Sequence, residues 1–127
     1  MARLLIVEDE AHIVRVLTLW LTRHGHQVLE APDGASALKV LERESVDLII
    51  CDMNMPVLSG AELAREVREG MKLGLPILMV TARCDQGRIA EQLAPYKVKL
   101  YPKPFVPSRL VADIERELGA VVREGGA

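Results

Sequence analysis

The feature that most constrains this chain is an alternation of short apolar runs with segments of helical periodicity. The apolar runs lie, in order, at 3–7, 27–31, 46–51, 76–80 and 98–101. Between them, apolar residues recur at three- and four-residue steps, which places them on one face of a helix. Parallel strands need such helical crossovers, and the crossovers cover both faces of the sheet. The pattern therefore predicts one α/β domain with a doubly wound, five-stranded parallel sheet and five helices.

Local signals set the expected ends of several helices. Gly25 is a natural C-terminal stop for the first helix. Ser59, with a glutamate three residues on, predicts a capping box at the start of the third helix. Residues 86–93 show a weaker helical pattern, which Pro95 ends. Ser108 is expected to cap the last helix.

Length and composition exclude several classes of protein. A chain of 127 residues that is 50% hydrophobic has the apolar mass for one ordinary core. We expect the domain to span residues 1–121, and residues 122–127 to be a flexible tail or the start of a linker. A net charge of −2 and an aromatic content of 3% argue against direct contact with nucleic acid.

The lack of recognisable targeting signals leads us to expect a cytoplasmic location. The apolar runs fall far short of the ~20 residues needed to cross a bilayer, so no membrane contact is expected. The first residues lack the apolar core and cleavage site of a signal peptide. Cys51 and Cys84 form no CxxC pair, so reduced thiols are expected, with Cys51 a buried small hydrophobe. Arg3, Arg65 and Arg68 are interpreted as surface charge.

Charged and hydroxyl residues follow four of the five expected strands. Glu8 and Asp9 follow the first strand, Asp52 the third, Thr81 the fourth and Lys103 the fifth. In open parallel sheets, ligands bind beyond the carboxyl ends of the strands, where the strand order reverses. We therefore expect these side chains to converge at one edge of the sheet.

The chemistry of that group favours a divalent cation and a phosphoryl group. Three converging carboxylates repel one another unless a cation is present. Oxygen ligands without His or Cys select a hard ion, and few protein ligands favour Mg²⁺ over Ca²⁺. With Mg²⁺ and Lys103 in place the negative charges are balanced, so a phosphoryl dianion can enter. Asp52 is then the candidate nucleophile, forming an aspartyl phosphate, and Thr81 offers a hydroxyl to one more oxygen.

Four motifs stand at these strand ends: Glu8-Asp9, Asp52-Met53-Asn54-Met55-Pro56 with Gly60 behind it, Thr81-Ala82, and Lys103-Pro104-Phe105. Together they resemble the signature of receiver domains of two-component response regulators, over about residues 3–118. The resemblance implies a flavodoxin-like fold with strand order 2-1-3-4-5. It also implies phosphotransfer from the phosphohistidine of a histidine kinase to Asp52, which makes the domain a switch in phosphorelay signal transduction.

The resemblance further assigns roles to individual residues. Asp9 and Asp52 would ligate Mg²⁺ directly, Glu8 would support it mainly through water, and the backbone carbonyl of Asn54 would supply another ligand. Lys103 would contact the phosphoryl group, from a Lys103-Pro104 bond expected to be cis. Thr81 would move toward the phosphoryl oxygen on activation. Such a domain is no enzyme in the ordinary sense, since it catalyses only its own phosphorylation and dephosphorylation.

The same resemblance implies partners. These are a sensor histidine kinase or phosphotransfer protein, and an output domain or effector protein. The face of the fourth helix, fifth strand and fifth helix is a candidate homodimer surface. The chain departs from the family at Leu100, where receivers often carry Tyr or Phe, while Tyr101 should point to the opposite face. Pro95-Tyr96 also replaces a pair that is usually small, so the output coupling is in question.

Three other functions remain open on the sequence. A flavin binder would share the fold, but the acidic first loop would repel the flavin phosphate. A phosphatase with an aspartyl nucleophile usually has a second Asp two residues after the first, whereas Asn54 stands there. The third alternative is a receiver-like protein-binding module that signals without phosphorylation. Intact Asp52, Thr81 and Lys103 argue against it, and Leu100 keeps it open.

Overall fold

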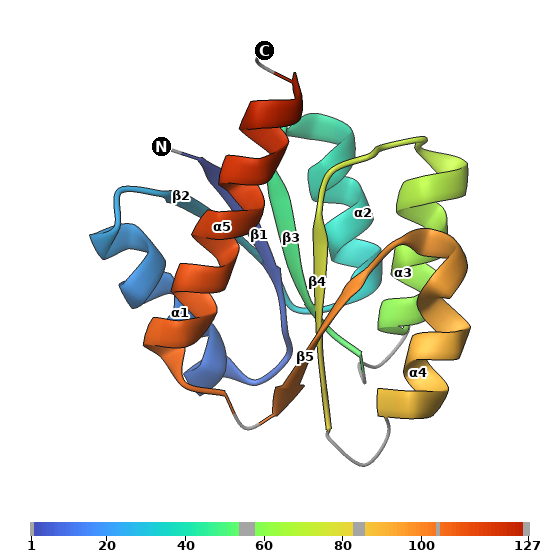
Figure 1. Ribbon diagram of the computed structural model, residues 1–127, viewed down its shortest axis with the longest axis horizontal. Helices are drawn as coiled ribbons and strands as arrows, with labels where there is room; N and C mark the ends of the chain where they lie inside the picture. Colours follow the sequence, from blue (N-terminus) through green and yellow to red (C-terminus); the bar gives the residue numbers. More distant parts are fainter. Residues whose placement is uncertain (1, 54–57, 83–85, 104, 126–127) are drawn as a thin grey trace.

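A computed structural model of the chain describes residues 2–53, 58–82, 86–103 and 105–125, and its centre is one parallel sheet. The strands are β1 (Arg3–Val7), β2 (Gln27–Ala31), β3 (Leu48–Asp52), β4 (Ile77–Ala82) and β5 (Lys99–Lys103). Their order is β2-β1-β3-β4-β5, and every neighbouring pair is parallel (Figure 1). The predicted α/β class and the flavodoxin-like strand order are therefore confirmed.

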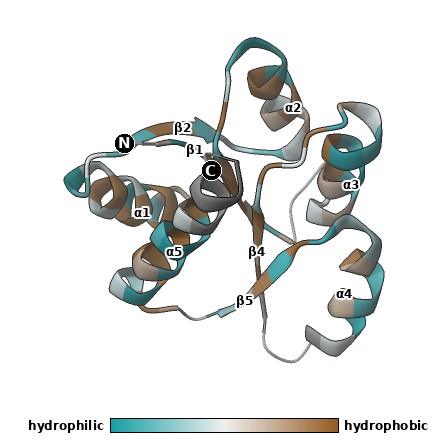
Figure 2. Cartoon of the chain, turned by 45° about the horizontal axis from the view of Figure 1, so that its top comes forward, coloured by the Kyte–Doolittle hydropathy of each residue, from teal (hydrophilic) through white to brown (hydrophobic). Residues whose placement is uncertain are grey.

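The helices cover both faces of this sheet. They are α1 (Ala11–Arg23), α2 (Gly34–Arg43), α3 (Gly60–Arg65), α4 (Gln86–Leu93) and α5 (Pro107–Gly125). A π-helical turn, η1 (Glu66–Gly70), continues α3, and a 3-10 turn, η3 (Ala94–Tyr96), follows α4. Helices α1 and α5 pack on one face, and α2, α3 and α4 pack on the other (Figure 1). The brown hydrophobic stripes of the helices turn toward the sheet in Figure 2.

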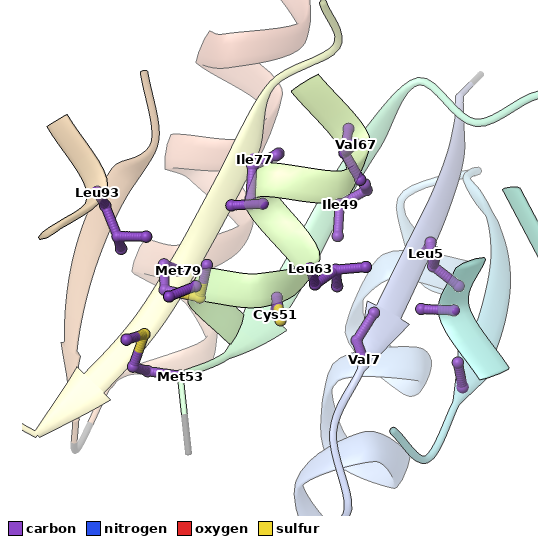
Figure 3. Close-up of a cluster of buried hydrophobic side chains, with 14 of the residues drawn as sticks. Leu5, Val7, Ile49, Cys51, Met53, Leu63, Val67, Ile77, Met79 and Leu93 are labelled. Carbon is purple, nitrogen blue, oxygen red and sulfur yellow. The ribbon is translucent and has the colours of Figure 1, made fainter. Parts of the chain in front are cut away.

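Alternate residues of the central strands fill two separate cores. The core beneath α2, α3 and α4 takes Leu5, Val7, Ile49, Cys51, Ile77 and Met79 from the strands (Figure 3). The core beneath α1 and α5 takes Leu4, Ile6, Leu48, Ile50, Leu78 and Val80. Because β1, β3 and β4 are apolar on both faces, they occupy the centre of the sheet, as continuous apolar runs predict. Leu100 packs on the first core and Tyr101 on the second, so the expected alternation in β5 is confirmed.

Some element ends differ from the sequence-based expectation. The runs at 3–7 and 27–31 match β1 and β2, whereas β3, β4 and β5 begin one or two residues later and end one or two residues later than the runs at 46–51, 76–80 and 98–101. Asp52, Thr81 and Lys103 therefore belong to their strands instead of following them. The reason is that backbone pairing continues through a polar residue whose side chain lies at the edge of the sheet.

Three of the predicted helix ends are confirmed and one is wrong. Helix α4 spans Gln86–Leu93 and ends before Pro95, as predicted. Gly25 has a φ of +86°, a left-handed conformation that a residue with a side chain rarely adopts. Ser59 and Glu62 form the capping box: the Ser59 N–H donates to Glu62 Oε1 (3.1 Å), and the Glu62 N–H donates to Ser59 Oγ (3.2 Å). Ser108 does not cap α5, because the helix begins one residue earlier, at Pro107. Proline suits a first helical position, where no N–H is needed.

One of the three arginines interpreted as surface charge has a structural role instead. Arg68 is half-buried and hydrogen-bonded to backbone carbonyls, so its interpretation as surface charge was wrong. In the part of the chain that the structure describes, no helix combines the length and the apolarity needed to cross a membrane. The predicted domain boundary at residue 121 falls within α5 and stays a prediction.

Candidate functional site

The carboxyl ends of β1, β3, β4 and β5 lie side by side at one edge of the sheet (Figure 1). The register pairs Val7 with Cys51, Asp52 with Val80, and Ala82 with Lys103, so the strands reach this edge almost level. This arrangement explains how Glu8, Asp52 and Lys103, which are far apart in the sequence, meet in one site. The site lies where the strand order reverses, between β1 and β3.

Three carboxylates meet there. Glu8, Asp9 and Asp52 each place a side-chain oxygen within 4.8 Å of the others. Glu8 and Asp52 are both 6% exposed, whereas Asp9 is exposed to solvent. The structure thus brings together the acidic residues that the sequence placed at this edge. Hard oxygen donors at this spacing, with excess negative charge, fit a divalent cation such as Mg²⁺.

Lys103 supplies the positive charge of the site. Its Nζ lies 3.2 Å from Asp52 Oδ2, 3.8 Å from Glu8 Oε2 and 4.0 Å from Glu10 Oε1. Partial burial lowers the pKa of Lys103, but the negative charges of Asp52, Glu8 and Glu10 outweigh it, so the pKa is raised above its ordinary value. The ammonium group therefore stays charged. Glu10 was not expected here, and its only signal in the sequence is its place directly after Glu8 and Asp9.

Glu8 holds a proton more firmly than an ordinary glutamate. Burial is the main cause, and the negative charge of Asp52 adds to it, while the Glu10 N–H (3.2 Å from Glu8 Oε1) and Lys103 oppose it. Together they raise the pKa of Glu8 to about 7. Without a cation, the site therefore takes up a proton near neutral pH to reduce its negative charge.

Thr81 is fully buried near the carboxyl end of β4. Among the described residues, its Oγ1 has no hydrogen-bond partner. A buried hydroxyl without a partner costs free energy, so its retention in the core needs a reason. A hydroxyl that can still donate one hydrogen bond is suited to an oxygen atom that arrives with a ligand.

The backbone around Asp52 is tightly packed against the start of α3. A Cβ on Gly60 would lie 2.6 Å from Met79 Sδ and 2.9 Å from the backbone oxygen of Asp52. The Gly60 N–H donates to the carbonyl of Met53 (3.0 Å). The start of α3 is therefore in close contact with the end of β3.

Cys51 is fully buried, as predicted, and burial raises the pKa of its thiol, which stays neutral.

Several predictions lie outside the described residues. They concern the carbonyl of Asn54 as a metal ligand and the cis bond between Lys103 and Pro104. The remaining predicted site residues, Glu8, Asp9, Asp52, Thr81 and Lys103, are described, and all lie at the same edge of the sheet.

Comparison with known proteins identifies the family. The profile of the response regulator receiver domain matches residues 4–115. A chemotaxis protein CheY homolog of Campylobacter jejuni is 37% identical over 128 residues, covering 98% of this chain and 98% of that protein. The alkaline phosphatase synthesis transcriptional regulatory protein PhoP of Bacillus subtilis is 37% identical over 113 residues, or 89% of this chain. The match covers 47% of PhoP, so the chain spans about half the length of that relative and nearly all of the CheY homolog.

Solved structures agree. The chemotaxis response regulator CheY4 of Vibrio cholerae superposes with a TM-score of 0.84 at 31% identity, covering 92% of this chain and 98% of that one. The receiver domain of the Francisella response regulator 1452 has a TM-score of 0.87 at 21% identity, covering 95% and 99%, and shows the shared fold. By sequence and by structure, the chain belongs to the family of response regulator receiver domains.

Proposed function

We propose that this receiver domain is a phosphorylation switch in which Asp52 accepts a phosphoryl group from the phosphohistidine of a histidine kinase or phosphotransfer protein. The observation that carries this proposal is the meeting of Asp52 with Lys103 at 3.2 Å beside Glu8 and Asp9. A nucleophilic carboxylate, a fixed cation and a set of hard oxygen ligands are the parts that such a transfer needs.

Glu8, Asp9 and Asp52 are the residues that would hold Mg²⁺, with the carbonyl of Asn54 as a predicted further ligand. A bound Mg²⁺ ion supplies charge balance for the oxygens of the transferred group. The cluster supports this because its three side chains offer oxygen ligands only. Occupation by a cation would also displace the proton that Glu8 holds near neutral pH.

The transfer itself exchanges one bond to phosphorus for another. A carboxylate oxygen of Asp52 forms the new O–P bond as the N–P bond of the phosphohistidine breaks, and the leaving imidazole nitrogen takes up a proton. Lys103 keeps its ammonium group beside the acceptor and donates to a phosphoryl oxygen. The buried hydroxyl of Thr81 is free to donate a hydrogen bond to another oxygen.

The surface beside Lys103 suits a protein donor. A hollow of ≈ 420 Å³ lies between α1 and the start of α5, lined by Ile13, Val16, Phe105 and Pro107 next to Lys103. Val16 is exposed in this lining, which also includes Glu10 and His12. An apolar rim around a charged site favours docking of a phosphohistidine protein over a free small molecule.

Three further expectations stay predictions: an output domain or effector as partner, a homodimer face on α4, β5 and α5, and a cytoplasmic location.

Intact-mass measurement tests the proposal. Incubation with acetyl phosphate and Mg²⁺ is expected to add one phosphoryl group, about 80 Da, and the gain is expected to disappear with EDTA. Asp52→Asn should abolish the gain, whereas the control Asp113→Asn, at an aspartate of α5 that is ion-paired with Arg116, should keep it. A folded protein that binds Mg²⁺ but gains no mass would contradict the proposal and favour a module that signals without phosphorylation.

A further inference from the structure

Arg68 forms a hydrogen-bonded clasp at the edge of the sheet opposite the candidate site. Its Nε donates to the carbonyl of Tyr96 (2.7 Å), and its Nη1 donates to the carbonyls of Leu73 (2.8 Å) and Leu75 (2.7 Å). Its Nη2 lies 3.4 Å from the carbonyl of Lys97. We call Arg68 and these four carbonyls the Arg68 clasp. One side chain thus ties η1 to the segment before β4 and to the turn between η3 and β5.

The clasp holds two turns that are strained on their own. Lys72 has a φ of +56° and Lys97 a φ of +52°, both in the left-handed region that non-glycine residues avoid. Each such conformation costs about 1 kcal/mol and persists where the surroundings impose it. Lys97 itself presents one of the bound carbonyls, and Lys72 directly precedes another, Leu73. Loss of the guanidinium would leave each turn with its backbone hydrogen bonds alone, from the Leu73 N–H to the carbonyl of Val67 and from the Lys97 N–H to the carbonyl of Ala94.

Helix α3, which η1 and Arg68 continue, begins beside Asp52. At its first residue, Gly60, there is no room even for a Cβ against the backbone oxygen of Asp52. Leu63 and Val67 then bury its length in the core beneath α2, α3 and α4 (Figure 3). Close packing along α3 provides a route by which a shift at the end of β3 can reach η1 and Arg68.

The turn η1 carries Arg68 in a π-helical register. Its π-helical form is marked by the N–H of Met71, which donates to the carbonyl of Glu66 at 2.8 Å. Such turns are rare, less favourable than α-helix, and frequent at functional sites. A one-residue change from π to α register would rotate the affected side chains by about 100°, given 3.6 residues per turn. Arg68 would then leave its carbonyls, so the clasp closes in one register only.

We propose that the Arg68 clasp couples the phosphorylation state of Asp52 to the start of β5, through α3 and η1. This inference rests on the proposed phosphorylation of Asp52 and names how that event reaches the other end of the sheet. Arg68 acts as a positioning residue: it takes no part in phosphoryl transfer and sets how firmly residues 97–101 are held.

Hydrogen exchange with mass measurement of the full chain tests the clasp. The native chain is compared with Arg68→Ala and Arg68→Lys, each with and without acetyl phosphate and Mg²⁺. Arg65→Ala is the matched control, because Arg65 is an exposed arginine at the end of the same helix. Circular dichroism checks that each variant is folded, and Arg68→Lys keeps the charge if Arg68→Ala unfolds, although lysine lacks the planar fork.

In the native chain and in Arg65→Ala, we expect phosphorylation to change amide exchange over residues 97–101 by about tenfold, or 1.4 kcal/mol. In both Arg68 variants, exchange there should be fast in either state, with less than a twofold response, while the mass gain at Asp52 is retained. A full exchange response in the Arg68 variants, or a native chain that gains the phosphoryl mass without any response, would overturn this inference alone. A native chain with no mass gain would overturn the proposed function and this inference with it.

Discussion

Lys103, at the end of β5, places its ammonium nitrogen 3.2 Å from the Asp52 carboxylate at the end of β3. One cation from an edge strand thus faces a carboxylate on the central strand. The pair exists without a phosphoryl group, so under the proposed function Lys103 would balance charge both before and after transfer.

Lys103→Ala is expected to slow phosphoryl uptake from acetyl phosphate at least about tenfold, because removal of a fixed charge from a transfer site has effects of this size. Thr81→Val should slow uptake less, since its hydroxyl contributes one neutral hydrogen bond. Rates of mass gain under excess Mg²⁺ measure both. Equal defects in the two variants would contradict this division of roles.

The raised pKa of Glu8 makes the stability of the metal-free protein depend on pH. Between about pH 4.5 and 7 the folded protein keeps a proton on Glu8 that the unfolded chain releases. The free energy of unfolding should therefore fall as pH rises through this interval, and the contribution is complete below pH 4.5. In urea unfolding with EDTA, the native chain should lose about 1–2 kcal/mol of unfolding free energy over this pH interval relative to Glu8→Gln, a figure discounted for solvent screening. Parallel plots of unfolding free energy against pH for the two proteins would refute the raised pKa of Glu8.

Asp9→Asn should have opposite effects with and without metal. Asp9 contributes repulsion within the carboxylate cluster, so its neutralisation should raise the free energy of unfolding of the metal-free protein by about 1 kcal/mol. The same change removes a proposed ligand, so added Mg²⁺ should stabilise the variant much less than the native chain. Unfolding curves in EDTA and in Mg²⁺ measure both. Unchanged stabilisation by Mg²⁺ would argue against Asp9 as a ligand.

Thr81→Val should stabilise the unphosphorylated protein. Within the described residues, the Thr81 hydroxyl is buried and has no hydrogen-bond partner. Its replacement by a methyl group should therefore gain about 1 kcal/mol in the free energy of unfolding, because the cost of burying an unsatisfied hydroxyl is removed. Chemical denaturation at one pH in EDTA gives the difference. A loss of stability would show that the hydroxyl already has a partner.

Ser59→Ala and Ser108→Ala form a matched pair at two helix starts. Ser59 caps α3 through its side chain, so its loss should cost about 1 kcal/mol of stability. Ser108 lies inside the first turn of α5, after Pro107, and its loss should change stability by less than about 0.5 kcal/mol. Thermal unfolding compares the two. An equal loss in both variants would mean that Ser108 has a capping role after all.

Most of the fold could be predicted from the sequence because its signals are local. Apolar runs and helical periodicity depend only on neighbouring residues, and they located all five strands to within two residues. The capping box at Ser59 and the left-handed Gly25 are also decided by a few adjacent positions. Strand ends were less predictable, because Asp52 and Lys103 pair through their backbones whatever their side chains carry.

The site was predictable as a set, and the Arg68 clasp was not. Each site residue stands at the end of a strand, so topology alone brings them together. Arg68 instead binds backbone carbonyls, and a carbonyl is present at every position. Nothing in the residue types at Leu75 or Tyr96 marks them as acceptors, and Tyr96 is 28 positions away. Glu10 was missed because its distance to Lys103 depends on the geometry of the loop after β1.

The two cores that the central strands separate share no side chain, since neighbouring residues along a strand belong to opposite sides. Substitutions on one side can therefore accumulate without a direct steric effect on the other. In this chain, α1 with the start of α5 borders the surface proposed for the phosphoryl donor, while α3 and the Arg68 clasp lie on the opposite side. Under the proposed function, substitutions that alter donor docking and substitutions that alter the Arg68 clasp can therefore be selected separately.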